Sequence, residues 1–168
     1  MVNIVLTKIA KMENSQENVT TSGGCQCGAL RYKIAGTLGS TDICHCRMCQ
    51  KAFGSWGAVL LRVSFDQFEW TRGKPSTFKS SAIVDRGFCN SCGTPMFMKE
   101  DGDSFLDLAV GTLDNPNIVK PLQSQIGIES KVLWFDQMHL LPAYSTDDDR
   151  NAEDLKMLKS LQHPDNDT

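Results

Sequence analysis

Short segments with strand-like patterns recur along the middle of the chain. Residues 29–34 alternate apolar with polar side chains, and residues 58–63 form a nearly continuous apolar run, as a buried strand would. Glycine, proline or acidic residues separate these segments, for example at 72–75 and 100–103. Short strands this frequent predict a mainly β domain built from antiparallel sheets. The expected strands are residues 29–34, 58–63, 68–71, 77–79, 83–88, 95–98 and 105–110.

The two ends of the chain have different patterns. We expect residues 1–21, which turn polar after a brief apolar run, to form a flexible N-terminal extension. Residues 144–168 begin with an acidic linker and then place Leu155, Leu158 and Leu161 at helical spacing. This pattern predicts a C-terminal amphipathic helix or tail packed on the domain. Residues 22–143 between the two ends are expected to form one domain.

Composition and charge narrow the function classes. The chain has 168 residues and a formal net charge of −3, with a pI near 5.6. Such a chain lacks the basic face of a nucleic-acid-binding protein, and no segment has the length or apolarity of a membrane span. The apolar run near residue 5 is too brief for a signal-peptide core, so we expect a cytoplasmic protein. Its expected partners are small molecules, and homodimerisation stays open.

Cysteine placement predicts the chemistry. The seven cysteines of the chain fall into two pairs and one triplet. The C-x-C pair at 25–27 and the C-x-x-C pair at 89–92 together supply the four sulfurs of a structural zinc site, because each pair lies on one tight turn. We predict that the two pairs enclose one zinc ion. The predicted ligands are Cys25, Cys27, Cys89 and Cys92.

The triplet supplies one ligand fewer than a closed zinc site needs. Cys44, Cys46 and Cys49 have C-x-C-x-x-C spacing, which lets three thiolates converge on one cation and leaves its fourth position open. Because an open position is typical of catalytic zinc, these three cysteines are predicted to be catalytic. A nearby His or Asp would instead close the site. We expect His45 to support a metal ligand or to lie at the surface, and His139 to be a structural histidine that could otherwise complete the open site.

Other uses of cysteine fit the sequence less well. A disulfide framework does not suit an odd number of cysteines in a chain without a visible secretory signal. Iron–sulfur sites favour a C-x-x-C-x-x-C run, which this chain lacks. Plain burial would account for one or two cysteines but not for three groups.

Five motifs appear in the order seen in the glutathione-dependent formaldehyde-activating family, also called the GFA or CENP-V domain, which the chain resembles over about residues 22–143. The motifs are residues 24–28, 44–51, 86–94, 110–116 and 128–134. The resemblance implies an Mss4-like fold of antiparallel sheets around a structural zinc. Matched by position, the two pairs look like structural zinc ligands and the triplet looks like the ligand set of a second, catalytic zinc. The chain departs from the family pattern at residues 127–129, where Gly-Ile-Glu replaces an expected His-Ile-Phe.

The resemblance also implies an activity, that of a carbon–sulfur lyase with two zinc ions that joins glutathione to formaldehyde, or another small thiol to a small carbonyl. Three thiolates give the zinc unit a net charge of about −1, which favours a soft thiolate as fourth ligand over water. Glutathione carboxylates need cationic contacts, for which the candidates are Arg47, Lys51 and Lys131. The alternative is a non-catalytic Mss4-like interaction module, because a fold alone does not fix activity.

Overall fold

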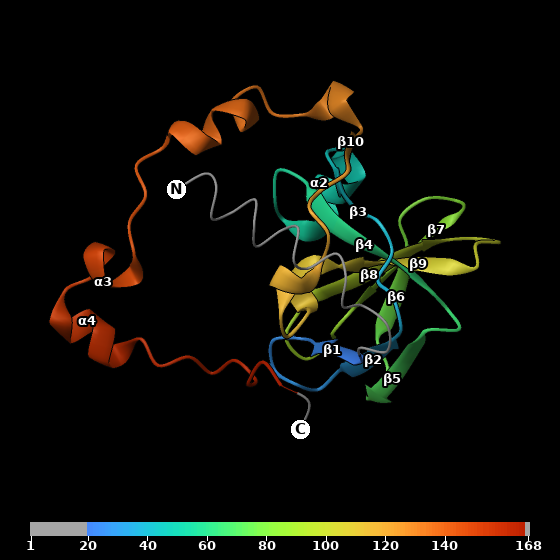
Figure 1. Ribbon diagram of the computed structural model, residues 1–168, viewed down its shortest axis with the longest axis horizontal. Helices are drawn as coiled ribbons and strands as arrows, with labels where there is room; N and C mark the ends of the chain where they lie inside the picture. Colours follow the sequence, from blue (N-terminus) through green and yellow to red (C-terminus); the bar gives the residue numbers. More distant parts are fainter. Residues whose placement is uncertain (1–19, 167–168) are drawn as a thin grey trace.

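The structure, a computed structural model, describes residues 20–166 and is dominated by β-strands (Figure 1). Within these residues ten strands form two sheets. The strands are β1 (Thr20–Gly24), β2 (Arg31–Ala35), β3 (Thr41–Cys44), β4 (Ala58–Ser64), β5 (Phe68–Arg72), β6 (Ser76–Lys79), β7 (Val84–Phe88), β8 (Pro95–Glu100), β9 (Phe105–Ala109) and β10 (Ser124–Ile126). The helices and 3-10 turns are α2 (Arg47–Phe53), η1 (Val110–Thr112), η2 (Pro116–Ile118), η3 (Ile128–Ser130), η4 (Phe135–Leu140), α3 (Thr146–Asp149) and α4 (Ala152–Met157).

The sheet topology confirms the predicted mainly β class. The smaller sheet has the strand order β1-β2-β5, and the larger has the order β10-β3-β4-β9-β8-β7-β6. Among the described strands, neighbours run antiparallel except β10 and β3, which run parallel, so the larger sheet is mixed. Each predicted strand overlaps an observed one. The observed strands are β2, β4, β5, β6, β7, β8 and β9.

The core lies between the two sheets. Tyr32 and Ile34 of the smaller sheet share one apolar cluster with Leu61 and Leu108 of the larger, and all four are 0% exposed. Burying an apolar side chain of this size stabilises the fold by about 1.5–3 kcal/mol. The Tyr32 hydroxyl is satisfied by a 2.9 Å hydrogen bond with Thr112 Oγ1. The two sheets therefore pack directly against each other through this cluster.

Helix α2 was not predicted by the alternation of residues. The chain is helical over Arg47–Phe53, directly after the first two cysteines of the triplet. Gly54 ends the helix with a left-handed backbone (φ 59°), and its N–H donates to the Gln50 carbonyl. The pattern also missed β1, β3 and β10, because these strands are short and rich in polar or small residues.

The C-terminal segment leaves the sheets and then returns to them (Figure 1). The predicted C-terminal helix forms as α4 but ends at Met157. Leu158 and Leu161 are 56% and 92% exposed, so they gain no packing that would extend the helix. Beyond α4 the tail reaches the turn between β1 and β2, where the His163 N–H donates to the Gln26 carbonyl over 2.8 Å.

Two further expectations were an N-terminal extension and the lack of a membrane-spanning segment. The predicted extension, residues 1–21, lies outside the described residues except for Thr20 and Thr21, which begin β1. Between residues 20 and 166, no helix is long and apolar enough to cross a membrane.

Candidate functional site

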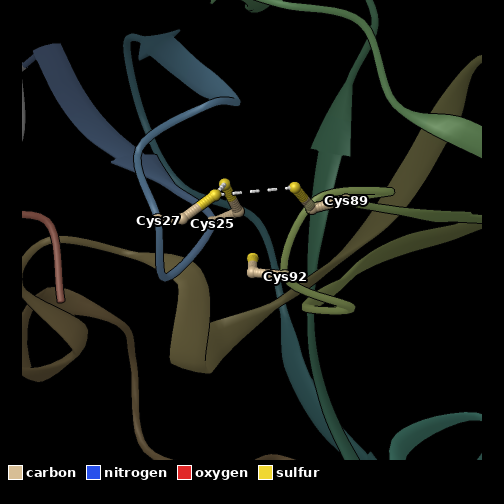
Figure 2. Close-up of side chains that lie close together, drawn as sticks. All are labelled: Cys25, Cys27, Cys89 and Cys92. Atoms are coloured by element: carbon tan, nitrogen blue, oxygen red, sulfur yellow. Dashed lines mark hydrogen bonds between the residues drawn. The ribbon is translucent and has the colours of Figure 1, made fainter. Parts of the chain in front are cut away.

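The two cysteine pairs meet in one cluster. Figure 2 shows Cys25 and Cys27, on the turn between β1 and β2, facing Cys89 and Cys92, on the turn between β7 and β8. The four Sγ atoms all lie within 4.8 Å of one another. The Sγ atom of Cys27 is 3.6 Å from that of Cys25 and 3.9 Å from that of Cys89. A tetrahedral zinc with Zn–S bonds of about 2.3 Å requires sulfurs about 3.8 Å apart. The cluster is therefore suited to zinc.

Hydrogen-bonding groups surround two of these sulfurs. The Leu30 N–H donates to Cys25 Sγ over 3.2 Å, and Cys92 Sγ lies 3.1 Å from the Thr94 hydroxyl. Burial raises the pKa of the Cys92 thiol, but hydrogen bonds from the Thr94 side chain and backbone outweigh it and bring this pKa to about 6. Because metal ligation requires deprotonated cysteine, this environment favours a bound cation.

The four-cysteine cluster has a structural position. Its two turns belong to different sheets, and Cys25 and Cys89 are part of the apolar core, at 3% and 0% exposed. A cation held here would clamp the sheets together at one end.

The triplet also converges. Cys44 ends β3, Cys46 is the N-cap of α2, and Cys49 lies in the first turn of that helix. Their Sγ atoms lie within 4.8 Å of one another. The Cys49 N–H donates to Cys46 Sγ over 3.4 Å, so the helix start itself orients one sulfur toward the others. This second cluster is also suited to zinc, with three sulfurs rather than four.

A buried arginine that the cysteine spacing does not predict faces the triplet. Arg86 on β7 is 3% exposed, and its Nη2 donates to Cys49 Sγ over 3.4 Å. Its Nε donates to Ser80 Oγ over 2.9 Å, which fixes the guanidinium. The pKa of Cys49 is lowered by a hydrogen bond from the Cys44 thiol and, against burial, by Arg86. Arg86 thus offsets part of the negative charge that three thiolates bring together.

His45 is buried beside the triplet rather than exposed at the surface. The side chain is 0% exposed, and its ring nitrogens contact the Trp56 carbonyl at 3.3 Å and Gln125 Oε1 at 3.2 Å. The neighbouring Gln50 donates from Nε2 to the His45 carbonyl over 2.6 Å and to the Ser130 carbonyl over 2.8 Å. Within residues 20–166 no histidine, His139 included, joins either cysteine group.

The three predicted glutathione contacts have different surroundings. Arg47 and Lys51 are exposed on α2, where Arg47 donates to Gln50 Oε1. Lys131 instead forms an ion pair of 2.8 Å with Asp136. Exposed Trp56 and Trp134 pack edge to face, with ring centroids 5.9 Å apart. Contact of these cations with glutathione stays a prediction.

Gly127, at the departure from the family pattern, touches the triplet directly. Its backbone is left-handed (φ 68°), and a Cβ built on it would lie 2.8 Å from the Cys46 nitrogen and 3.0 Å from the Cys46 Cβ. A side chain at position 127 would therefore push against the N-cap of α2.

We expect Gly127→Ala to weaken metal binding at the triplet at least tenfold while the four-cysteine cluster keeps its metal. The physical reason is that the added methyl displaces Cys46. Chelator competition with zinc-loaded protein measures both affinities. Gly102→Ala is the matched control, because Gly102 is also left-handed (φ 88°) but has no atom within 4 Å of its built Cβ. Equal zinc affinity in both variants would show that this contact does not position Cys46.

Comparison with known proteins agrees with this geometry. Residues 20–128 match the family described as "Glutathione-dependent formaldehyde-activating enzyme". A crystal structure of a Rhodobacter sphaeroides protein, solved as a structural genomics target, is similar with a TM-score of 0.50 and 18% sequence identity; the match covers 62% of this chain and 98% of that one. At this identity the likeness shows the fold alone. No curated protein matches the chain. Since the family match covers more than half of the chain, the protein belongs to the glutathione-dependent formaldehyde-activating family.

Proposed function

We propose that this protein is a zinc-dependent carbon–sulfur lyase that joins the thiol of glutathione, or of a similar small thiol, to formaldehyde or another small carbonyl. The observation that carries the proposal is the convergence of Cys44, Cys46 and Cys49, which offers three sulfurs where a closed zinc site has four. The four-cysteine cluster already offers a closed site, and a non-catalytic scaffold would need only that one.

The residues around the triplet suit thiol chemistry. A zinc ion bound there would lower the pKa of an incoming thiol and keep its sulfur close to the carbonyl carbon. Cys46 and Cys49 are held by the helix start, and Arg86 balances their charge. This arrangement prepares the centre before substrate arrives, so little reorganisation accompanies the reaction.

Surface cations support the choice of glutathione as the thiol. Arg47 and Lys51 are exposed on the helix that also carries Cys49, and Lys131 follows Ser130, whose carbonyl is bonded to Gln50 of that helix. Carboxylates of a bound tripeptide would find charged donors around the open position. Zinc, glutathione and formaldehyde are in this proposal the cofactor and the two substrates.

The proposal predicts about two zinc ions per chain and a heat of glutathione binding in calorimetry. Cys49→Ser is expected to retain only the zinc of the four-cysteine cluster and to lose the glutathione heat, because one of three sulfurs is gone. Met157→Ser is the control, since it removes an exposed sulfur in α4. About one zinc in the unchanged protein, or glutathione binding that survives Cys49→Ser, would refute the proposal.

A further inference from the structure

An apolar pocket of about 210 Å³ lies between α2 and the strands β6 to β8. Aromatic rings form much of its wall, with one small side chain and one cation. The lining residues include Ala52, Phe53, Phe78, Arg86, Phe88 and Phe97. A buried apolar cavity of about 150 Å³ accepts benzene. The pocket is therefore large enough for one aromatic ring with a short substituent.

Two of its wall residues connect the pocket to the triplet. Phe53 packs against the apolar cluster that contains Cys49, and Cys44 and Cys46 pack on the same cluster. Arg86 lines the pocket and donates from Nη2 to Cys49 Sγ over 3.4 Å. A molecule in the pocket would thus have the guanidinium on the side that leads to the cysteine sulfurs.

Arg86 also has an unused donor. Within the described part of the chain, its buried Nη1 has no hydrogen-bond partner, whereas Nε and Nη2 bond to Ser80 and Cys49. A buried charged donor without an acceptor is unfavourable, so this position calls for an oxygen supplied from outside the chain. The side chain is 3% exposed and lines the pocket, so an acceptor oxygen would have to reach it through the pocket.

Charge decides what kind of oxygen fits. Three thiolates and a divalent cation carry about −1, which the guanidinium neutralises. A carboxylate entering beside them would leave an uncompensated negative charge in an apolar pocket. A neutral carbonyl oxygen would accept from Nη1 without that cost.

We propose that this pocket is the subsite for a carbonyl substrate larger than formaldehyde: a neutral aldehyde whose aromatic group lies among Phe53, Phe78, Phe88 and Phe97, and whose oxygen accepts a hydrogen bond from Arg86 Nη1. The inference rests on the proposed function and specifies its substrate class. It makes Arg86 a catalytic residue, since its Nη1 would contact the reacting oxygen.

The chemical step is an addition without oxidation or reduction. The thiolate sulfur forms a bond to the aldehyde carbon, and the electron pair of the C=O π bond moves to oxygen. Arg86 Nη1 stabilises the negative charge that develops there, and the proton that the thiol lost ends on this oxygen through solvent. The product is a hemithioacetal. Loss of one donor to such an oxyanion lowers rates by about 10²–10³-fold in other enzymes.

The first test compares benzaldehyde with formaldehyde as partners of glutathione. Ala52→Leu fills the pocket from the helix without loss of helix propensity, and we expect the ratio of kcat/KM for benzaldehyde to that for formaldehyde to fall at least tenfold. Ala143→Leu, at an exposed position outside the pocket, is expected to leave the ratio unchanged. A ratio that Ala52→Leu does not change would overturn the inference.

The second test measures binding without turnover. With zinc-loaded protein and no thiol, we expect fluorine NMR to show 4-fluoroacetophenone, an unreactive carbonyl, binding about tenfold or more tightly than 4-fluorotoluene, because only the ketone accepts from a charged donor. Ala52→Leu should abolish this binding, and 4-fluorobenzoate should bind worse than the ketone. Equal binding of ketone and toluene, or tighter binding of benzoate, contradicts the assignment of Arg86.

The two tests separate this inference from the function that it rests on. A protein that binds glutathione and adds it to formaldehyde, but neither binds 4-fluoroacetophenone nor uses benzaldehyde, would refute the pocket and leave the proposed function standing. A protein that binds the ketone but gives no heat with glutathione would refute the proposed function, and the pocket would remain a carbonyl-binding site.

Discussion

Cys89→Ser is expected to prevent the domain from folding. Cys89 is 0% exposed, belongs to the core cluster and is one of four converging sulfurs. Structural zinc contributes about 10–16 kcal/mol of apparent binding free energy in small zinc domains, which is as large as the whole stability of a typical domain, about 5–15 kcal/mol. Serine binds zinc poorly and leaves a buried hydroxyl among apolar neighbours. Circular dichroism, proton NMR dispersion and zinc content measure the outcome.

The control for this variant lies on the same turn. Asn90→Ser changes an exposed neighbour of Cys89 and is expected to keep both the fold and the metal. Removal of zinc from the unchanged protein with a strong chelator should reproduce the unfolding. A Cys89→Ser protein that unfolds cooperatively near the temperature of the unchanged protein would mean that packing of the sheets suffices and that the four-cysteine cluster is not structural.

Asp114→Ala is expected to lower the free energy of unfolding by about 3–5 kcal/mol, the usual effect of removing one partner of a buried ion pair. Arg31 is 2% exposed and donates from both terminal nitrogens to Asp114, over 2.8 Å and 2.5 Å. The Ser22 hydroxyl donates to the same carboxylate over 2.5 Å. Because these residues join β1, β2 and the segment after η1, alanine would remove the carboxylate that accepts from both Arg31 and Ser22 at that junction. Urea denaturation measures the loss.

Low pH should reduce the contribution of the Asp114–Arg31 ion pair to the free energy of unfolding. Burial raises the pKa of Asp114, but the hydrogen bonds from Arg31 and Ser22 outweigh burial and hold this pKa below its ordinary value. The unfolded chain therefore takes up the proton first, and the stabilisation is fully present above pH about 4 and is lost as the pH falls through the folded pKa. The difference in stability between the unchanged protein and Asp114→Ala should narrow in that range.

A second acidic residue provides the comparison. Asp107 pairs with Arg62 over 3.2 Å, but the Arg62 side chain is 51% exposed, so Asp107→Ala should cost about 0–1 kcal/mol. If the two alanine variants lost equal stability, burial would not be the reason for the effect at Asp114.

The alternation of apolar and polar residues predicted those strands that have one buried face and one more exposed face. In β2, Tyr32 and Ile34 are buried while Lys33 between them is half-buried, and this contrast is visible in the sequence. β10 has three exposed residues and is held by backbone pairing to β3, so it carries no such contrast. The predicted C-terminal helix forms but ends at Met157 for a related reason: leucines at helical spacing lengthen a helix only where a surface buries them, and here Leu161 is 92% exposed.

The metal ligands were predictable because their chemistry is local. The sulfurs of a pair such as Cys89 and Cys92 converge within one turn of the chain, and the C-x-x-C spacing predicts that turn. Arg86 was not predictable in this way, because its partners Ser80 and Cys49 come from separate parts of the chain and a polar residue on a strand is ordinarily expected to face water. Gly127 was noted only as a departure from the family pattern, and the structure supplies its reason in the contact with Cys46.

The separation of the ligands along the chain has a consequence for synthesis on the ribosome. Cys27 and Cys89 are 62 residues apart, whereas the triplet spans one short segment between them. At about 5–20 residues per second, translation releases the triplet about 2–9 seconds before Cys92. The nascent chain therefore presents three unprotected thiolates to cellular copper, iron and zinc before the sheets exist to select among them, and the identity of the metal at the triplet is open to kinetic competition during that interval.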